Sequence, residues 1–294
     1  EIGFDFSDTI DIITLPLISG FLGSDVLAAV LATHHERWDD GTMLIDVGTN
    51  GEVVLLDQGH FSATSCATGP AFEGASIRHG MHAVSGAIDA VRIDARTGMA
   101  RCSVIQKDPQ NPRQPSGICG SGVVSAIAEL YKTGLISTDG RLLNNRFPDV
   151  FLCDENDLPQ YLLIAAEHSR TNRAITITQN DVRAIQLAKG ALYTGIHLLC
   201  SETGILKPSK MLIAGAFGSY INKQDALTMG LFPEIDIADL NIVGNAAGAG
   251  AILTLFDETL RQKALELAQS IRVIDLARHP DFQEVFMRSL SFPI

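Results

Sequence analysis

The chain has 294 residues, of which 46% are hydrophobic and 19% charged, and its formal net charge at pH 7 is −12. This composition indicates a globular protein with a sizeable core, and the length allows one large domain or two smaller ones. The negative charge argues against a nucleic-acid backbone or an anionic membrane surface as the main partner, but a nucleotide held by backbone amides and a metal ion stays compatible with it. No uninterrupted apolar run reaches membrane-spanning length.

The cysteines supply no iron–sulfur or zinc ligand set, because no two of them have the C-x-x-C spacing. An odd number of widely spaced cysteines favours free thiols in a reducing cytosol, so we expect a cytoplasmic protein. The five are Cys66, Cys102, Cys119, Cys153 and Cys200. The chain begins at Glu1 without a basic, apolar leader, which we interpret as the middle of a longer protein.

The first 20 residues are expected to form an extended lead-in, and Ser24 or Asp25 is expected to cap a short helix that follows. An apolar strand then runs from Leu44 into a turn, and a second apolar strand returns to Leu56. We predict that Gly48 and Gly51 take positive φ values and bring the backbone close to a ligand.

The turn of this hairpin carries more polar chemistry than a hairpin needs, namely Asp46, Thr49, Asn50 and Glu52. Exposed N–H groups in such a turn form a concave anion site, and Asp46 could orient a metal-bound water beside it. The alternative is an ordinary hairpin with an Asn-Gly turn.

The next segments alternate strands with loops of small residues. We expect a strand over 61–66, a small-residue loop over 67–75, strands over 87–93 and 101–105, and a surface loop over 106–116. Gly117–Gly122 then opens a helix, where phosphate is favoured at the N-terminus, although the glycines could instead serve close helix–sheet packing. Neither the dinucleotide fingerprint nor the P-loop pattern occurs.

The second half of the chain alternates helices with single strands after an irregular stretch over 134–160. A strand at 174–177 leads into a capping box at Thr178–Asp181, which starts a long helix that ends at Gly204. The remaining expected elements are a buried strand at 211–214, a small-residue turn at 215–220, a helix at 224–229, a helix from Gly244 to about Ser270, a strand at 271–276 and a helix at 281–290. This order predicts a mixed α/β sheet with helices on its faces.

Together, the small-residue loops suit a polyphosphate with its metal, because backbone donors and one or two carboxylates are enough to position it. Such a site needs no nucleophilic side chain. Local spacing suggests no Ser-His-Asp or Cys-His set, and Gly-x-Ser-x-Gly does not occur.

Two of these segments resemble motifs of the superfamily of actin, sugar kinases, acetate kinase and heat-shock chaperones. Residues 46–52 (DVGTNGE) resemble its second phosphate-binding hairpin, and residues 212–218 (LIAGAFG) resemble its adenosine motif. Within the superfamily, the chain is most similar to the ATP-dependent, ferredoxin-linked reductive activators of corrinoid proteins. The similarity extends in order over 15–32, 45–54, 67–75, 117–130, 177–199, 214–220, 244–251 and 281–283.

The resemblance implies a ribonuclease-H-like (actin-like ATPase) α/β fold, in which a mixed sheet is flanked by helices and ATP with Mg²⁺ lies in a cleft. It also implies an N-terminal two-iron ferredoxin-type domain as electron donor and a corrinoid protein as partner, whose Co(II) is returned to Co(I) with ATP hydrolysis. On this basis the domain division is 1–40, a lead-in and helix from a preceding subdomain, and 41–294, the actin-like ATPase subdomain or subdomains. A homodimer is possible, and neither nucleic acid nor membrane is an expected partner.

The chain departs from the family in two respects. It has no cysteine cluster for an iron–sulfur centre and no second Asp-x-Gly-Thr hairpin upstream of Asp46. We therefore expect the C-terminal part of a longer activator, with one phosphate hairpin, weak nucleotide affinity and little turnover on its own.

Carried over by position, Asp46 is the candidate for orienting the metal or the attacking water, and Glu52 either aids a metal shell or braces the turn. Glu73 and Lys189 are weaker candidates, because each is more typical of a structural ion pair. The residues expected to meet phosphate are Gly48, Thr49, Asn50 and Gly51, those expected to meet adenosine are Gly215, Ala216, Phe217 and Gly218, and Gly120, Ser121 and Gly122 are expected to line the same cleft.

Two other functions stay open at this point. The domain could be a module that docks the corrinoid protein and keeps only a vestigial nucleotide site. It could also be a small-molecule kinase of the same superfamily, but no acid–base residue for a substrate hydroxyl or carboxylate is identifiable.

Overall fold

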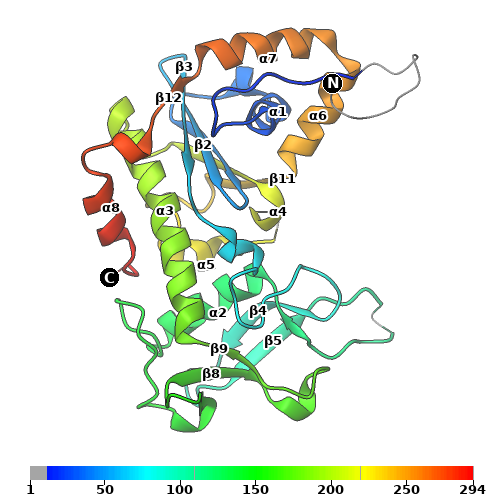
Figure 1. The fold of residues 1–294 in the computed structure, drawn as a ribbon, viewed down its shortest axis with the longest axis vertical. Coiled ribbons are helices and arrows are strands. Elements are labelled where there is room, and N and C mark those ends of the chain that lie inside the picture. The colour runs from blue at the N-terminus through cyan, green and yellow to red at the C-terminus, as the bar shows by residue number, and fades with distance from the viewer. Residues whose placement is uncertain (1–11, 109, 219, 294) are drawn as a thin grey trace.

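The computed structural model describes residues 12–108, 110–218 and 220–293, so most of the expected lead-in lies outside the described residues. Two lobes follow one another along the long axis of the molecule (Figure 1). We call residues 67–178 the small lobe and the remaining described residues the large lobe. Helix α3 (Gln179–Thr203) runs beside both lobes.

The large lobe is built on a six-stranded sheet in the order β11-β10-β1-β2-β3-β12. The first three strands in sequence form an antiparallel meander, and β10, β11 and β12 add to it in parallel pairs. The bounds are Thr42–Val47 for β1, Gly51–Asp57 for β2, His60–Cys66 for β3, Lys210–Ala214 for β10, Leu240–Gly244 for β11 and Arg272–Val273 for β12. The predicted mixed α/β sheet flanked by helices is confirmed.

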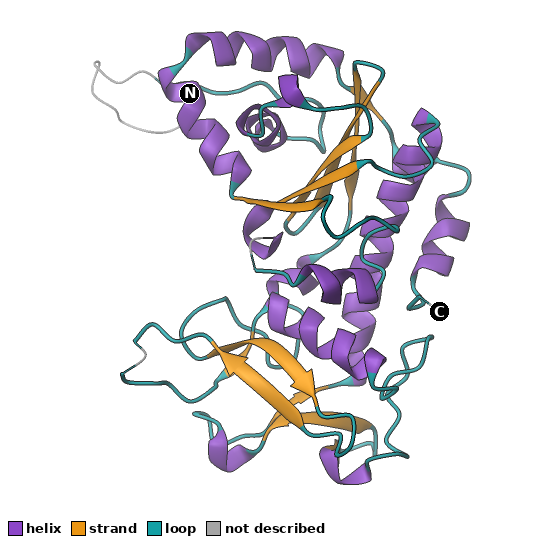
Figure 2. Cartoon of the chain, turned by 180° about the vertical axis from the view of Figure 1, so that it is seen from behind, coloured by secondary structure: helices purple, strands orange, loops and turns teal. Residues whose placement is uncertain are grey.

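Both faces of this sheet are covered, which explains why β1 is apolar on both sides. Met43 and Ile45 face the core shared with α3, whereas Leu44 packs into a second core beneath α1 (Ser24–Ala32). Helices α6 (Ala246–Phe256) and α7 (Glu258–Ser270) lie on the side of α1, and α8 (Phe282–Ser289) packs against α3 (Figure 2).

Glycines at the helix interfaces allow backbones to approach closely. A Cβ on Gly250 would lie 1.8 Å from the carbonyl oxygen of Ala28, and one on Gly195 would lie 2.1 Å from the sulfur of Cys66. These glycines therefore let α6 pack closely on α1 and let α3 pack closely on β3.

The small lobe consists of α2 (Gly120–Lys132) and two three-stranded sheets, in the orders β5-β4-β6 and β7-β8-β9. Helix α2 packs on β4, and a Cβ on Gly122 would lie 2.2 Å from the carbonyl oxygen of Ile88. The strands are β4 (Ala87–Ile93), β5 (Ala100–Val104), β6 (Gly117–Ile118), β7 (Phe151–Cys153), β8 (Pro159–Ile164) and β9 (Ile175–Ile177).

A buried carboxylate ties the two lobes together. Asp225, in α5 (Lys223–Thr228) of the large lobe, is 1% exposed and accepts from Lys132 Nζ at 2.8 Å and from Arg92 Nη1 at 3.2 Å. Lys132 and Arg92 belong to α2 and β4 of the small lobe, so this ion-pair network crosses the lobe junction.

Several local predictions are confirmed and others are wrong. The capping box at Thr178–Asp181 and the end of α3 at Gly204, with φ +77°, are as predicted. The α1 N-cap is Gly23 rather than Ser24 or Asp25. The helix expected from Gly244 to Ser270 is two helices that meet at Asp257, the turn at 215–220 contains the short helix α4 (Gly215–Gly218), and β7, β8 and β11 were not predicted. In the part of the chain that the structure describes, no helix is long and apolar enough to cross a membrane.

Candidate functional site

A cavity of about 330 Å³ lies where the two lobes meet. Residues from both lobes line it, including the end of β1, the start of α2 and the start of α4. Its lining residues are Asp46, Val47, Gly48, Phe72, Glu73, Met81, His82, Ala83, Cys119, Gly120, Ser121, Gly215 and Tyr220. Three segments that the sequence predicted to form one site therefore lie around one cavity.

Asp46 and Glu52 form a cross-strand pair at the closed end of the β1–β2 hairpin. Burial, and then the negative charge of Asp25, raises the pKa of Asp46. Burial, and then the charges of Asp25 and Asp46, raises the pKa of Glu52 to about 7. Only Asp46 lines the cavity, so the two carboxylates have different surroundings.

The glycines of the hairpin turn do not have the backbone conformation predicted for them. Neither Gly48 nor Gly51 has a positive φ, because the turn closes through a hydrogen bond from the Gly48 N–H to the Asn50 carbonyl oxygen at 2.9 Å. Gly51 is needed for packing instead, since a Cβ there would lie 2.9 Å from Leu192 of α3. The Gly48 amide is thus occupied within the turn in this conformation.

Hydroxyl groups brace the turn from the neighbouring loop. Thr68 donates to the carbonyl oxygen of Thr49 at 3.0 Å, and the Thr49 hydroxyl donates to Glu73 Oε1 at 2.9 Å. Glu73 ends the short helix η2 (Pro70–Glu73) and lines the cavity, whereas Thr49 and Asn50 are exposed and are not among its lining residues. Glu73 therefore lines the same cavity as Asp46 and has a hydroxyl as its hydrogen-bond partner.

The N-terminus of α2 opens onto the same cavity through Gly120 and Ser121. This helix has neither a side-chain N-cap nor an acidic residue in its first turn, and its first N–H groups have no intrahelical acceptor. Those N–H groups and the helix dipole favour an anion here. Gly122 does not line the cavity, because it packs against β4.

The turn after β10 abuts the hairpin, as the parallel pairing of Asp46 with Ala214 requires. Gly215 has a φ of +92°, and a Cβ there would lie 2.6 Å from the carbonyl oxygen of Val47 and 2.7 Å from Asp46 Oδ1. Gly218 is buried against Ile213. The side chains of Ala216 and Phe217 lie outside the described part of the chain.

Other lining residues carried no signal in the sequence. Met81, His82 and Ala83 come from an irregular segment of the small lobe, and Tyr220 follows the glycine-rich turn with 66% of its surface exposed. Met81, His82 and Ala83 reach the cavity only because the small lobe folds back over the hairpin, and no local pattern encodes that contact.

Lys189 lies away from the cavity and forms no ion pair with any residue that the structure describes. Its Nζ donates to the carbonyl oxygens of Ser289 at 2.5 Å and of Ser291 at 2.8 Å, and burial lowers its pKa to about 8. Lys189 thus anchors the segment after α8 to α3, which is a structural role.

The residues present fit a phosphate-bearing ligand accompanied by a divalent cation. A helix N-terminus supplies donors, and the carboxylates of Asp46 and Glu73 supply the oxygen ligands that Mg²⁺ prefers. Among the described residues, no group of three or more His, Cys, Asp or Glu side chains is arranged to hold a metal ion. A cation here would therefore share phosphate oxygens and water, which is usual for Mg²⁺.

Comparison with known proteins gives concordant matches. Residues 40–294 match the family described as the C-terminal domain of RACo, the ASKHA domain. The corrinoid activation enzyme RamQ of Eubacterium limosum is 36% identical over 95% of this chain and 47% of its own length. The [Co(II) methylated amine-specific corrinoid protein] reductase of Methanosarcina barkeri is 27% identical over 99% of this chain and 53% of its own length.

A solved structure agrees with the sequence matches. The reductive activator for corrinoid,iron-sulfur protein superposes with a TM-score of 0.86 at 32% identity, over 95% of this chain and 44% of that chain. The chain thus spans about half the length of the relatives that it matches.

Proposed function

This chain belongs to the family of C-terminal ASKHA domains named for RACo, and from that premise we propose that it is the nucleotide-binding part of an ATP-dependent reductive activator of a corrinoid protein. The observation that carries the proposal is the cavity at the lobe junction. This cavity of about 330 Å³ is lined by Asp46 and Gly48 of the hairpin, by Gly215 of the turn after β10 and by the N-terminus of α2.

Each group has a task that its chemistry suits. Asp46 holds the metal or orients the attacking water, because its carboxylate lines the cavity and no nucleophilic side chain is needed for phosphoryl transfer to water. The N–H groups at the start of α2 donate to phosphate oxygens, and Gly215 keeps the adenosine end of the site close to the hairpin. Bound Mg²⁺ would neutralise the charge that develops on the phosphate oxygens.

Glu52 supports the site from outside the cavity and is not one of its lining residues. It faces Asp46 across the hairpin and lies outside the cavity lining, so we assign it the role of bracing the turn. Gly51 and Gly122 support the proposal in the same way, by letting α3 and α2 approach the strands.

In the whole protein, we propose that one electron passes from a two-iron ferredoxin-type domain to Co(II) of the corrinoid protein, giving Co(I), while ATP is hydrolysed. The names of the relatives, two of which refer to corrinoid activation and one to Co(II) corrinoid protein reduction, support this assignment. Residues 41–294 form the ASKHA unit in this proposal, and the match that starts at residue 40 supports that boundary.

The chain alone should bind nucleotide more weakly than the full-length protein. It has no second Asp-x-Gly-Thr hairpin upstream of Asp46, and its relatives are about twice as long. Calorimetric titration of both proteins with magnesium-ATP tests the proposal. We expect saturable binding by the full-length protein and weaker binding by this chain. A full-length protein that neither binds nor hydrolyses ATP would leave a docking module with a vestigial site as the better account.

A further inference from the structure

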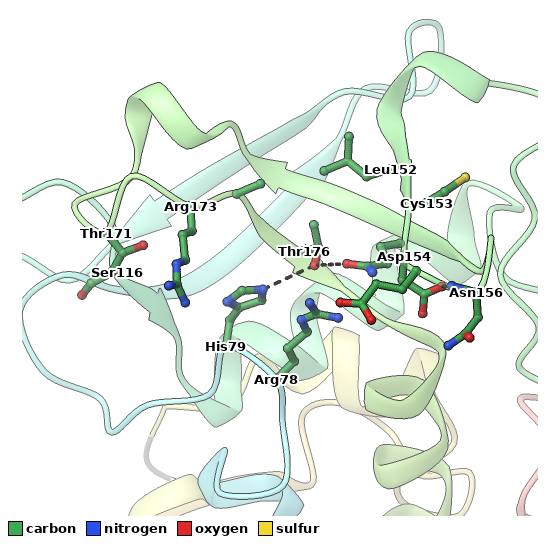
Figure 3. Close-up of a pocket in the computed structure, with 13 residues that line it drawn as sticks. Arg78, His79, Ser116, Leu152, Cys153, Asp154, Asn156, Thr171, Arg173 and Thr176 are labelled. Carbon is green, nitrogen blue, oxygen red and sulfur yellow. Dashed lines mark hydrogen bonds between the residues drawn. The ribbon is translucent and has the colours of Figure 1, made fainter.

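The small lobe contains a second, larger cavity of about 1010 Å³ that shares no lining residue with the cleft at the lobe junction. It lies between the loop that carries Arg78 and His79 and the sheet β7-β8-β9 (Figure 3). Polar and charged side chains dominate its lining, which is Arg78, His79, Ser116, Leu152, Cys153, Asp154, Glu155, Asn156, Gln160, Thr171, Arg173, Ala174 and Thr176.

Two guanidinium groups enter this cavity without a protein partner. Figure 3 shows Arg78 and Arg173 on either side of the His79 ring. Neither guanidinium forms an ion pair or a hydrogen bond with any residue in the part of the chain that the structure describes. Arg is the side chain that binds oxyanions in a bidentate way.

Buried polar groups form the floor between the two arginines. Thr176, 2% exposed, donates to Gln160 Oε1 at 2.9 Å and lies 3.4 Å from His79 Nε2. Because the hydroxyl has one proton, His79 Nε2 is the donor to Thr176. Gln160 is 7% exposed, and its amide nitrogen is left with two N–H donors for a ligand.

The loop that carries Arg78 and His79 is fixed by its backbone. The Arg78 N–H donates to Asp181 Oδ1 at 2.8 Å, and the His79 carbonyl accepts from the Ile118 N–H at 2.8 Å. The backbone of this loop therefore loses little conformational freedom when a ligand binds. Burial, and then Arg78, lowers the pKa of His79, with Asp181 acting in the opposite direction, so the guanidinium groups supply the positive charge at neutral pH.

Asp154 lies at the end of the cavity away from Arg173 (Figure 3). Asp154 Oδ1 accepts from the N–H groups of Asn156 and Leu158 at 2.8 and 2.9 Å, which closes the turn between β7 and β8. Figure 3 places Asp154 and Asn156 on the side away from Arg173. Arg173 therefore lies at the end away from Asp154, whereas Arg78 lies between the His79 ring and Asp154 (Figure 3).

We propose that this cavity is a second binding site, for a small molecule that places an oxyanion, phosphate or carboxylate, between Arg78 and Arg173. The oxyanion is bound by the two guanidinium groups, with the amide of Gln160 and the hydroxyl of Thr171 as further donors. The site is distinct from the nucleotide cleft, because the two cavities share no lining residue.

The test is calorimetric titration of the chain with pyrophosphate and, separately, with citrate, each to about 10 mM, at constant ionic strength. Arg173→Gln and Arg78→Gln are compared with Arg96→Gln, which removes the same charge from an exposed arginine that lines neither cavity. Both cavity arginines are exposed, and the thermal midpoint of each variant verifies that it folds.

We expect saturable binding of at least one anion that is weakened about tenfold or more by Arg173→Gln and by Arg78→Gln, and unchanged within about twofold by Arg96→Gln. Any pyrophosphate bound in the nucleotide cleft would be the same in the wild type and in all three variants. If only the binding of pyrophosphate depends on the cavity arginines, the cavity is a phosphate site, and if only that of citrate does, it is a carboxylate site. Absence of saturable binding to the wild-type chain, or binding that both cavity variants retain, would overturn the proposal.

Discussion

Replacing Gly215 by alanine should lower the free energy of unfolding of the large lobe. Gly215 lies where the turn after β10 meets the β1–β2 hairpin. Its φ of +92° is unfavourable for any residue with a Cβ, and the new Cβ would lie 2.6 Å from the Val47 carbonyl oxygen and 2.7 Å from Asp46 Oδ1. The nearest atom belongs to the backbone of a central strand, so a side-chain rotation cannot relieve the contact.

Two terms add up to the expected cost of Gly215→Ala. Left-handed backbone costs a non-glycine residue about 1–2 kcal/mol, and an overpacked contact costs about 1–3 kcal/mol. We expect a loss of about 3 kcal/mol in the free energy of unfolding, which corresponds to a fall of roughly 6–12 °C in the thermal midpoint.

Two other glycine-to-alanine variants separate these terms. Gly59 has a φ of +77° and a Cβ added there would have no atom within 4 Å, so Gly59→Ala should cost only the backbone term of about 1 kcal/mol. Gly48 has neither feature, since the atoms nearest to an added Cβ would be 3.7 and 3.9 Å away, and Gly48→Ala should change stability by less than about 0.5 kcal/mol. Urea unfolding of the three variants measures the differences. A Gly215→Ala variant as stable as Gly59→Ala would refute the close contact between the two motifs.

Two further predictions concern charged groups near the lobe junction. Because the folded state raises the pKa of Glu52 from 4.5 to about 7, it holds this proton more tightly than the unfolded state does, and stability should fall as the pH rises from about 4.5 through about 7. In urea unfolding, the Glu52→Gln variant should have the same free energy of unfolding as the wild type near pH 4 and a value up to about 3 kcal/mol higher at pH 8. An equal difference at both pH values would contradict this prediction. Asp225→Asn should lower the free energy of unfolding by about 2 kcal/mol. The substitution removes a 1%-exposed carboxylate that pairs with Lys132 and Arg92, but both cations can then be hydrated again. Glu284→Gln, in an exposed pair with Arg288 at 3.8 Å, is its control and should change stability by less than about 0.5 kcal/mol.

The sequence predicted the ends of an element correctly where residues close in sequence cap it. The capping box at Thr178–Asp181 and the glycine at the end of α3 were readable because each depends on residues close in sequence. Strand β11 was missed because Leu240–Gly244 is short and leads directly into a Gly/Ala-rich helix. The division between α6 and α7 was missed because it depends on Asp257 alone, whose side chain accepts from the Thr259 N–H.

The candidate site was only partly readable for a related reason. The hairpin and the glycine-rich turn were predicted to lie together, and the parallel pairing of β1 with β10 places them so. The positive φ values at Gly48 and Gly51 were wrong, because a glycine required for packing and one required for backbone conformation look alike in a sequence. Met81 and His82 could not be predicted, because their place in the cavity depends on the packing of the small lobe against the large one.

The central claim is that Asp46 works in a nucleotide site at the lobe junction, and ATP hydrolysis by the full-length protein carrying Asp46→Ala tests it most directly. We predict that turnover falls by about 10²-fold or more, because the carboxylate that orients the metal or water is lost. The thermal midpoint should not fall, since burial raises the pKa of Asp46 and its charge opposes folding. Turnover equal to that of the wild type would contradict the assignment of this residue and of the cleft that it lines.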